Sequence, residues 1–96
     1  MPFETFDWDE DKAASNLRKH GVEFVAALPV FTDPVGVERV DMDSRAHAEG
    51  RYLLTGLYGQ DVLTVVSAER QDVVRIISAR RATRSEHDDY YRQNSR

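Results

Sequence analysis

Five arginines are concentrated in a stretch that otherwise reads as two buried strands. They are Arg70, Arg75, Arg80, Arg81 and Arg84, and the same stretch, from Glu69 to Arg84, holds only two acidic residues. A guanidinium held in a half-apolar strand loses hydration energy unless a carboxylate, a phosphate or solvent receives it. The cluster therefore indicates an anion-binding surface, and Glu69 places a candidate base beside it.

Other residue types that support catalysis are sparse. The three histidines, His20, His47 and His87, show no i, i+4 pairing of the kind that puts two metal ligands on one helix face. The absence of cysteine excludes a thiol nucleophile and a thiolate metal site. The five glycines are isolated, so no glycine-rich phosphate loop is present. The sequence predicts neither a metal nor a cofactor.

Length and composition are those of one globular domain over residues 1–96, with 41% hydrophobic and 31% charged residues. The net charge of −4 is uneven: residues 1–50 carry 5 basic against 11 acidic side chains, and residues 51–96 carry 8 against 6. Such a protein does not coat nucleic acid indiscriminately, but a local arginine patch can hold a few phosphates. No apolar stretch approaches the roughly 20 residues of a membrane span and no signal peptide is evident, so we expect a cytoplasmic protein without a membrane partner.

Two helices are expected before the strands. The first spans Glu10 to His20, with Asp9 as N-cap, acidic residues at its start and basic residues at its end. Gly21 is expected to stop it in a Schellman termination, with an apolar contact between Leu17 and Val22. A second, shorter helix from Phe24 to Leu28 should end or kink at Pro29, which lacks an amide donor.

The remainder predicts an antiparallel meander and a last helix. We expect an edge strand at 35–41, a loop at 43–50, strands at 51–58, 62–70 and 73–81, and a helix at 84–93 that begins with a capping box of Thr83 and Glu86. The fold class is thus α+β, with an antiparallel sheet of about four strands. Tyr90 and Tyr91 supply the apolar surface of the last helix, which either docks through these rings or is mobile until a partner binds.

The hairpin at Gln71-Asp72 decides which charged side chains share a face. A simple two-residue loop makes Arg70 and Arg75 diagonal neighbours on one face and puts Glu69 with Arg80 on the other. A bulged three-residue loop instead brings Glu69 opposite Arg75. The loop lacks the glycine that a type I′ turn favours, and the sequence leaves both registers open.

Residues distributed over nearly the whole chain resemble the BrnT family of bacterial toxins. The combination of a WD…K…N..KHGV opening with an RIISAR strand is highly specific. The matching residues are Trp8-Asp9, Lys12, Asn16, Lys19-His20-Gly21-Val22, Phe24, Phe31-Thr32-Asp33-Pro34, Glu69-Arg70, Arg75-Ile76-Ile77-Ser78-Ala79-Arg80 and Glu86 to Tyr90.

This resemblance implies a RelE-like small ribonuclease that inhibits translation by cutting RNA. It also implies neutralisation by a BrnA-type antitoxin encoded beside it, in a hetero-oligomer that contacts DNA only through the antitoxin. Metal-independent RNA cleavage requires a base for the 2′-hydroxyl, a cationic clamp for the phosphate and an acid for the leaving oxygen. The predicted catalytic residues are Glu69, Arg70, Arg75, Arg80 and His20, and the predicted RNA-binding residues are Lys19, Arg81, Arg84, Tyr90 and Tyr91.

Several of these assignments have a structural alternative: Arg80 and Arg81 end a strand near solvent, so at least one of them is expected to be only a solvated charge. Arg75 can form a surface ion pair across the strands, and His20 suits the negative end of the helix dipole. One of Tyr90 and Tyr91 is expected to pack, while the other stacks on a nucleobase or meets the antitoxin. For the whole molecule, the alternative is a non-catalytic binding module that uses the same sheet face. The acidic first helix is the expected site for basic segments of a partner.

Overall fold

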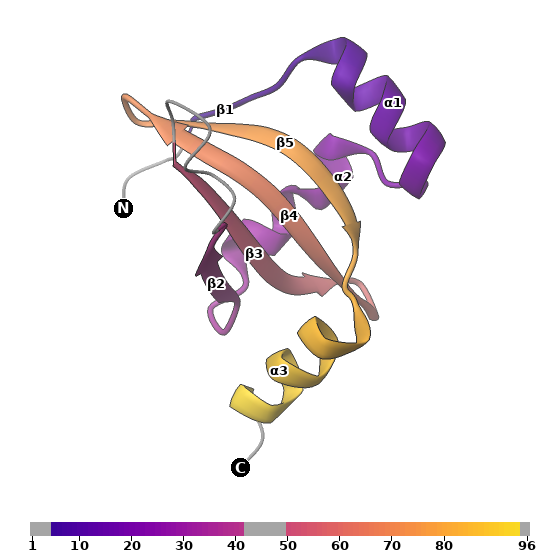
Figure 1. Cartoon of the computed structure of the whole chain (residues 1–96), viewed down its shortest axis with the longest axis vertical. Coiled ribbons are helices and arrows are strands. Elements are labelled where there is room, and N and C mark those ends of the chain that lie inside the picture. The colour runs from indigo at the N-terminus through magenta and orange to yellow at the C-terminus, as the bar shows by residue number, and fades with distance from the viewer. Residues whose placement is uncertain (1–4, 42–49, 95–96) are drawn as a thin grey trace.

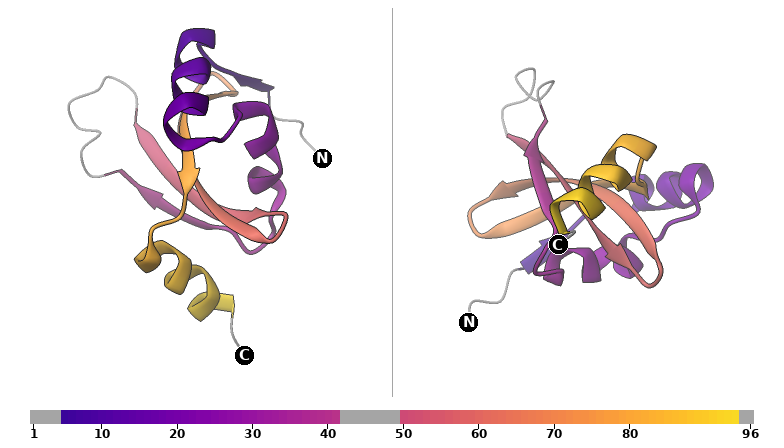
Figure 2. Two further views of the ribbon diagram at one scale, coloured as in Figure 1. Left: turned by 90° about the vertical axis from the view of Figure 1, so that its right-hand side faces the viewer. Right: turned by 90° about the horizontal axis from the view of Figure 1, so that it is seen from below.

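The structure is a computed structural model that describes residues 5–41 and 50–94. A five-stranded mixed sheet with strand order β1-β5-β4-β3-β2 forms the body, with helices on one face and α3 at one end (Figures 1 and 2). The elements are β1 (Thr5–Asp7), α1 (Glu10–His20), α2 (Phe24–Ala27), the 3₁₀ helix η1 (Leu28–Thr32), β2 (Val37–Val40), β3 (Arg51–Tyr58), β4 (Asp61–Arg70), β5 (Val73–Arg81) and α3 (Arg84–Asn94). The predicted α+β class is confirmed.

The strand missing from the sequence prediction is β1, which pairs in parallel with β5. The sheet is therefore mixed, and the expectation of a purely antiparallel sheet is wrong. Phe6 of β1 contacts Phe31, with 4.9 Å between the ring centroids. A three-residue strand whose partner lies more than sixty residues away carries no local turn or alternation signal, so the pattern could not predict it.

Helix α1 forms where the sequence predicts it. The Asp9 carboxylate accepts hydrogen bonds from the amides of Asp11 and Lys12 at 2.8 and 3.1 Å. Gly21 has φ 70°, and its amide donates to the Leu17 carbonyl at 2.9 Å. This bond is that of the simple αL termination rather than the predicted Schellman motif, and Leu17 keeps 45% of its surface exposed.

The second helix changes character at its end. α2 stops at Ala27, and η1 continues the chain as a 3₁₀ helix with Pro29 in its first turn. Proline costs little there because the first amides of a helix have no internal acceptor. η1 lies so close to β3 that a side chain at Gly56 would meet the Val30 Cγ1 atom at 3.1 Å, which explains the glycine.

The other predicted elements differ from the observed ones at their ends. The edge strand is shorter (β2), β4 begins one residue earlier, and α3 extends to Asn94. The capping box is confirmed: the Glu86 amide donates to Thr83 Oγ1 at 3.2 Å, and the Thr83 amide donates to Glu86 at 2.8 Å. Except for Gly50, the predicted loop at 43–50, with His47, lies outside the described residues.

The core lies between the sheet and the helices α1 and α2 with η1; in Figure 1, α2 and η1 lie behind the sheet and α1 lies to its upper right. Its buried members are Val22, Phe24, Ala27, Val30, Leu63, Val65, Ile76 and Ala79. We call this side of the sheet the helix face. Because side chains alternate along a strand, the residues between the core positions point to the opposite face.

The β4–β5 hairpin has the two-residue loop that was one of the two predicted options. Ala68 faces Arg75 and Arg70 faces Val73. Gln71 and Asp72 have φ values of 52° and 67°, the left-handed conformation that a type I′ turn requires at both positions. Arg70 and Arg75 are therefore diagonal neighbours on the face opposite the core.

One extra residue in β5 then reverses the predicted position of Arg80. Ser67 faces Ile76 but Val66 faces Ser78, so Ile77 is left over as a bulge. Arg80 consequently faces Thr64 and shares the face of Arg70 and Arg75. The prediction that Glu69 and Arg80 share a face is wrong, because the parity argument assumed an uninterrupted ladder.

Asn16 joins α1 to the edge of β5. Its buried amide donates to the carbonyls of Ala79 and Val22 at 2.8 and 3.0 Å and accepts from the Ala79 amide at 3.1 Å. β1 pairs with β5 only at Val73–Arg75. Asn16 therefore satisfies backbone groups further along that edge that would otherwise be buried without partners.

Candidate functional site

Five arginines project from one face of the sheet, opposite the helix face. They are Arg39 of β2, Arg51 of β3, Arg70 of β4, and Arg75 and Arg80 of β5, and we call this side the arginine face. The register aligns Arg51, Ala68, Arg75 and Asp7 across four adjacent strands. Ala68, the residue between Arg51 and Arg75, is 1% exposed and therefore covered by its neighbours.

Glu86, at the start of α3, is bound by arginines of two strands, β5 and β2, that β4 and β3 separate. Arg80 donates to its two carboxylate oxygens at 2.7 and 3.0 Å, and Arg39 donates to one of them at 2.6 Å. Thr64 adds a hydroxyl bond at 2.9 Å, in addition to the amide of Thr83. A single buried carboxylate thus fixes two arginines and anchors the first turn of α3.

The charge state of Glu86 follows from these contacts. Burial by itself raises the pKa of its carboxyl, but the hydrogen bonds from Arg80, the Thr83 amide and Thr64, together with the charge of Arg80, outweigh burial and lower the pKa to about 2. Glu86 is therefore ionised at neutral pH and accepts a proton poorly. The hydrogen bond to Glu86 in turn raises the pKa of Arg80.

Arg75 has a weaker partner. Its Nε atom lies 3.4 Å from the Asp7 carboxylate, and both side chains are about half exposed. The surface ion pair considered for Arg75 is therefore present, but exposed pairs of this kind contribute little and are readily exchanged. Arg70 is exposed at the end of β4.

Helix α3 is docked rather than mobile. The Tyr90 hydroxyl donates to Asp33 at 2.6 Å, and the same carboxylate accepts the Leu57 amide at 2.9 Å. Burial and this hydrogen bond to Asp33 raise the pKa of Tyr90 to about 12. Tyr90 is 3% exposed and packs, whereas Tyr91 is 46% exposed and contacts the His87 ring at a centroid distance of 4.8 Å.

The structure does not bring Glu69 together with the arginines. Glu69 faces Val74 and lies on the helix face, where it lines a cavity of about 200 Å³. The other lining residues are Phe31, Glu38, Tyr52, Ser67 and Val74. The sequence left two hairpin registers open, and the structure has the one with a two-residue loop. This register places the candidate base, Glu69, on the face opposite the arginines.

The other sequence candidates lie away from this face or are solvated. Lys19 and His20 are exposed at the end of α1, which packs on the core side. Arg81 faces Leu63 on the helix face and pairs with Asp61 at 3.0 Å. Arg84 is almost fully exposed and lies 3.8 Å from Asp88.

Sequence reasoning missed Arg39, Arg51, Thr64 and Asp33. Arg39 and Arg51 lie in segments that were predicted as strands. Pairing these strands in the order β4-β3-β2 would have placed both arginines on the same face as Arg75 and Arg80 of β5. The bond between Asp33 and Tyr90 spans 57 residues and has no counterpart in local spacing.

Within residues 5–41 and 50–94, no group of three or more His, Asp or Glu side chains is arranged to hold a metal ion. No helix in this part of the chain combines the length and apolar character needed to cross a membrane.

Comparison with known proteins gives the family. The model of a family described as the ribonuclease toxin BrnT of type II toxin-antitoxin systems matches residues 8–86. The chain belongs to the BrnT family. The match begins at Trp8 and ends at Glu86, and it therefore includes the five arginines of the arginine face. No curated protein with which the sequence was compared matches it.

Membership of the BrnT family makes the chain a ribonuclease toxin of a type II toxin-antitoxin system, which implies RNA as a target and an antitoxin as a partner. The resemblance noted in the sequence is thereby confirmed.

Proposed function

We propose that this BrnT protein is a metal-independent endoribonuclease that cleaves RNA by attack of the 2′-hydroxyl, inhibits translation and is neutralised by a BrnA-type antitoxin. The observation that carries the proposal is the alignment of Arg51 and Arg75 across Ala68, with Arg39, Arg70 and Arg80 on the same face. The α+β architecture also supports the RelE-like arrangement that the sequence resemblance implies.

The reaction requires stabilisation of the extra negative charge that develops on phosphorus. A guanidinium holds two phosphate oxygens at once and stays charged throughout, and removing one such preorganised donor costs about 3 kcal/mol of transition-state stabilisation. We infer that Arg51 and Arg75 form the clamp for the scissile phosphate, because the register places them on the same face, on the two strands that flank Ala68. The weak Asp7 pair of Arg75 can be exchanged for a phosphate.

The carboxylates have different parts in this proposal. Glu86, with a pKa of about 2, is a positioning residue that holds Arg80 and Arg39 rather than a general base. Glu69 lies on the helix face, away from the clamp. We infer that electrostatic stabilisation by the arginines supplies most of the rate enhancement, and that the exposed ring of Tyr91 is available to stack on a nucleobase.

Cleavage of a labelled RNA by the purified chain, with and without EDTA, tests the proposal. We expect cleavage in both conditions, and a rate for Arg75→Ala that is lower by about 100-fold. Arg81→Ala is the matched control, because Arg81 lies on the same strand, on the opposite face, in a similar surface pair; its rate should be unchanged.

Three results would overturn the proposal. Cleavage that is abolished by EDTA would exclude the metal-independent mechanism. Equal rates for the Arg75→Ala and Arg81→Ala variants would exclude the arginine face as the site. RNA that is bound but stays intact would favour a non-catalytic binding module.

A further inference from the structure

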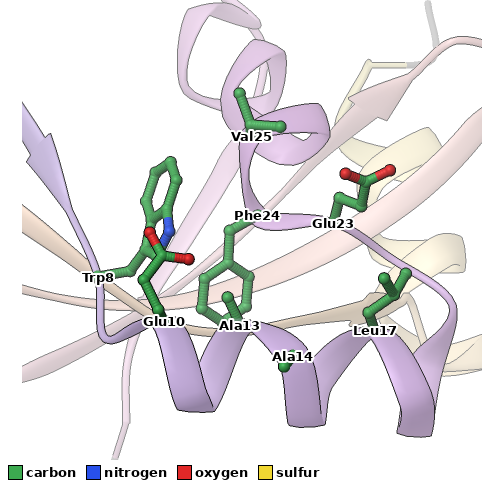
Figure 3. Close-up of a pocket in the computed structure, with 8 residues that line it drawn as sticks. All are labelled: Trp8, Glu10, Ala13, Ala14, Leu17, Glu23, Phe24 and Val25. Carbon is green, nitrogen blue, oxygen red and sulfur yellow. The ribbon is translucent and has the colours of Figure 1, made fainter.

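An apolar groove lies on the helix side of the molecule, between α1 and the segment that leads into α2. Its volume is about 270 Å³, with the side chain of Trp8 at one end and that of Phe24 in the middle (Figure 3). The full lining is Trp8, Glu10, Ala13, Ala14, Leu17, Glu23, Phe24 and Val25. Val25 is 57% exposed and Leu17 45%, so large apolar side chains at this groove meet water in the isolated chain.

The charged residues that line the groove are both acidic. Glu10 stands beside Trp8, and Glu23 lies on the far side of Phe24, so a carboxylate flanks each end of the apolar surface (Figure 3). No salt bridge within residues 5–41 and 50–94 involves either carboxylate. A ligand that covers the apolar surface would therefore meet two carboxylates available for pairing.

We propose that this groove docks the antitoxin through an amphipathic segment. Apolar side chains of the segment cover the exposed Leu17 and Val25, and its lysines or arginines pair with Glu10 and Glu23. Two features favour this occupant: charge complementarity to a basic amphipathic helix and the antitoxin partner that type II family membership implies. This inference rests on the proposed function, because it names the surface by which the toxin is held.

The position of the groove has a mechanistic consequence. α1 and α2 pack on the helix face, whereas the proposed clamp lies on the arginine face. The docking segment therefore leaves the arginines unoccupied. Substitutions in the groove should consequently weaken binding of the antitoxin and leave RNA cleavage unchanged.

Calorimetric titration of the purified full-length chain with the antitoxin encoded beside it tests the proposal. Val25→Lys places a cation in the acid-flanked apolar surface and should raise the dissociation constant at least about 30-fold, the loss typical of a central interface residue. Val40→Lys is the matched control, since Val40 is 59% exposed but lies on β2, away from the groove. It should bind as the wild type does.

A charge reversal provides a second variant. Glu10→Lys combined with Glu23→Lys should weaken binding and make it less sensitive to salt. Equal dissociation constants for the wild type, Val25→Lys and this double variant would overturn the proposal. Absence of binding by the wild-type chain would do the same.

Trp8 is the only tryptophan of the chain and gives a local readout. After labelling of the toxin with 5-fluorotryptophan, its single ¹⁹F resonance should shift when the unlabelled antitoxin is added, and an unchanged resonance in the bound complex would place the antitoxin elsewhere. RNA cleavage is measured separately on each variant. A wild-type chain that does not cleave RNA would refute the proposed function, whereas the binding and ¹⁹F data would still decide the groove.

Discussion

Glu86 of α3 joins its helix to three strands of the sheet through one carboxylate. It caps α3 and receives Arg80 from β5, Arg39 from β2 and the Thr64 hydroxyl from β4. Its capping role was predictable because Glu86 follows Thr83 by three positions. Its pairing with Arg39 was not, because 47 residues separate them and only the sheet brings them together.

Replacement of Glu86 should reveal a pH-dependent part of the stability. The pKa of Glu86 falls from 4.5 to about 2 on folding, which corresponds to about 3 kcal/mol of folding free energy. Because the folded pKa is depressed, this stabilisation is present above pH 4.5 and is lost as the pH falls toward 2. Urea unfolding at pH 7 should show Glu86→Gln less stable by about 3 kcal/mol, with a difference that shrinks on acidification.

A surface acid of the same helix is the control for this measurement. Asp88 is 53% exposed and lies 3.8 Å from Arg84. Asp88→Asn should change the free energy of unfolding by less than about 0.5 kcal/mol. A Glu86→Gln difference that stayed constant from pH 7 to pH 3 would contradict the role assigned to this carboxylate.

Asn16 provides a second residue-scale prediction. Asn16→Ala removes three buried hydrogen bonds and leaves the Ala79 amide and carbonyl without partners, so we expect a loss of about 3 kcal/mol. Asn94→Ala, which removes two bonds at the exposed end of α3, should cost less than about 1 kcal/mol. Equal thermal denaturation midpoints for the two variants would show that Asn16 does not hold α1 to β5.

At the scale of elements, α3 illustrates how a weakly apolar helix is positioned. Its apolar content could not decide between docking and mobility, because the deciding contacts are polar and come from distant segments. Tyr90 reaches Asp33 after η1, and Glu86 reaches the sheet. The start of α3 was predictable from its capping box, but its position on the molecule depends on these tertiary contacts.

Loss of the Tyr90 hydroxyl should loosen α3 without disturbing the core. Tyr90→Phe keeps the buried ring but removes the bond to a carboxylate, at a cost of about 2 kcal/mol. Hydrogen exchange of α3 amides should accelerate, while exchange in β4 changes little. Tyr91→Phe is the control, because that ring is 46% exposed; identical exchange in both variants would rule out docking through Tyr90.

The sequence pattern predicted the positions of the strands well, but it did not predict which side chains lie on which face of the sheet. The two-residue hairpin was one of two registers left open, and the extra residue at Ile77 was outside both. A bulge depends on how two strands fit over a core, so no single residue type in β5 predicts it. For this reason the sequence identified Arg70, Arg75 and Arg80 as site residues but placed Arg80 on the wrong face, and it missed Arg39 and Arg51.

The molecule as a whole is acidic, with a net charge of −4, while one sheet face gathers arginines. RNA affinity should therefore arise locally and depend on salt. If about three phosphates are contacted, the logarithm of the association constant should fall with a slope of about −2 against the logarithm of the salt concentration.

This slope can be measured by fluorescence anisotropy with a 2′-O-methyl RNA, which lacks the attacking hydroxyl. Arg51→Ala should reduce the steepness by about 0.7, the contribution of one phosphate on a single strand. Arg81→Ala, on the helix face, should leave it unchanged. A slope near zero for the wild type would contradict phosphate binding by the arginine face.

The bulge residue of β5, Ile77, also predicts where the coding sequence tolerates the deletion of one codon. Deleting the Ile77 codon converts the bulge into an uninterrupted ladder in which Ser67 still faces Ile76 and Val66 still faces Ser78. Every later side chain then keeps its present orientation. β3 pairs without interruption from Arg51 to Tyr58, so a one-codon deletion there turns the following side chains over. In-frame deletions recovered from a library selected for growth arrest should accordingly be found at codon 77 and be missing from the middle of β3.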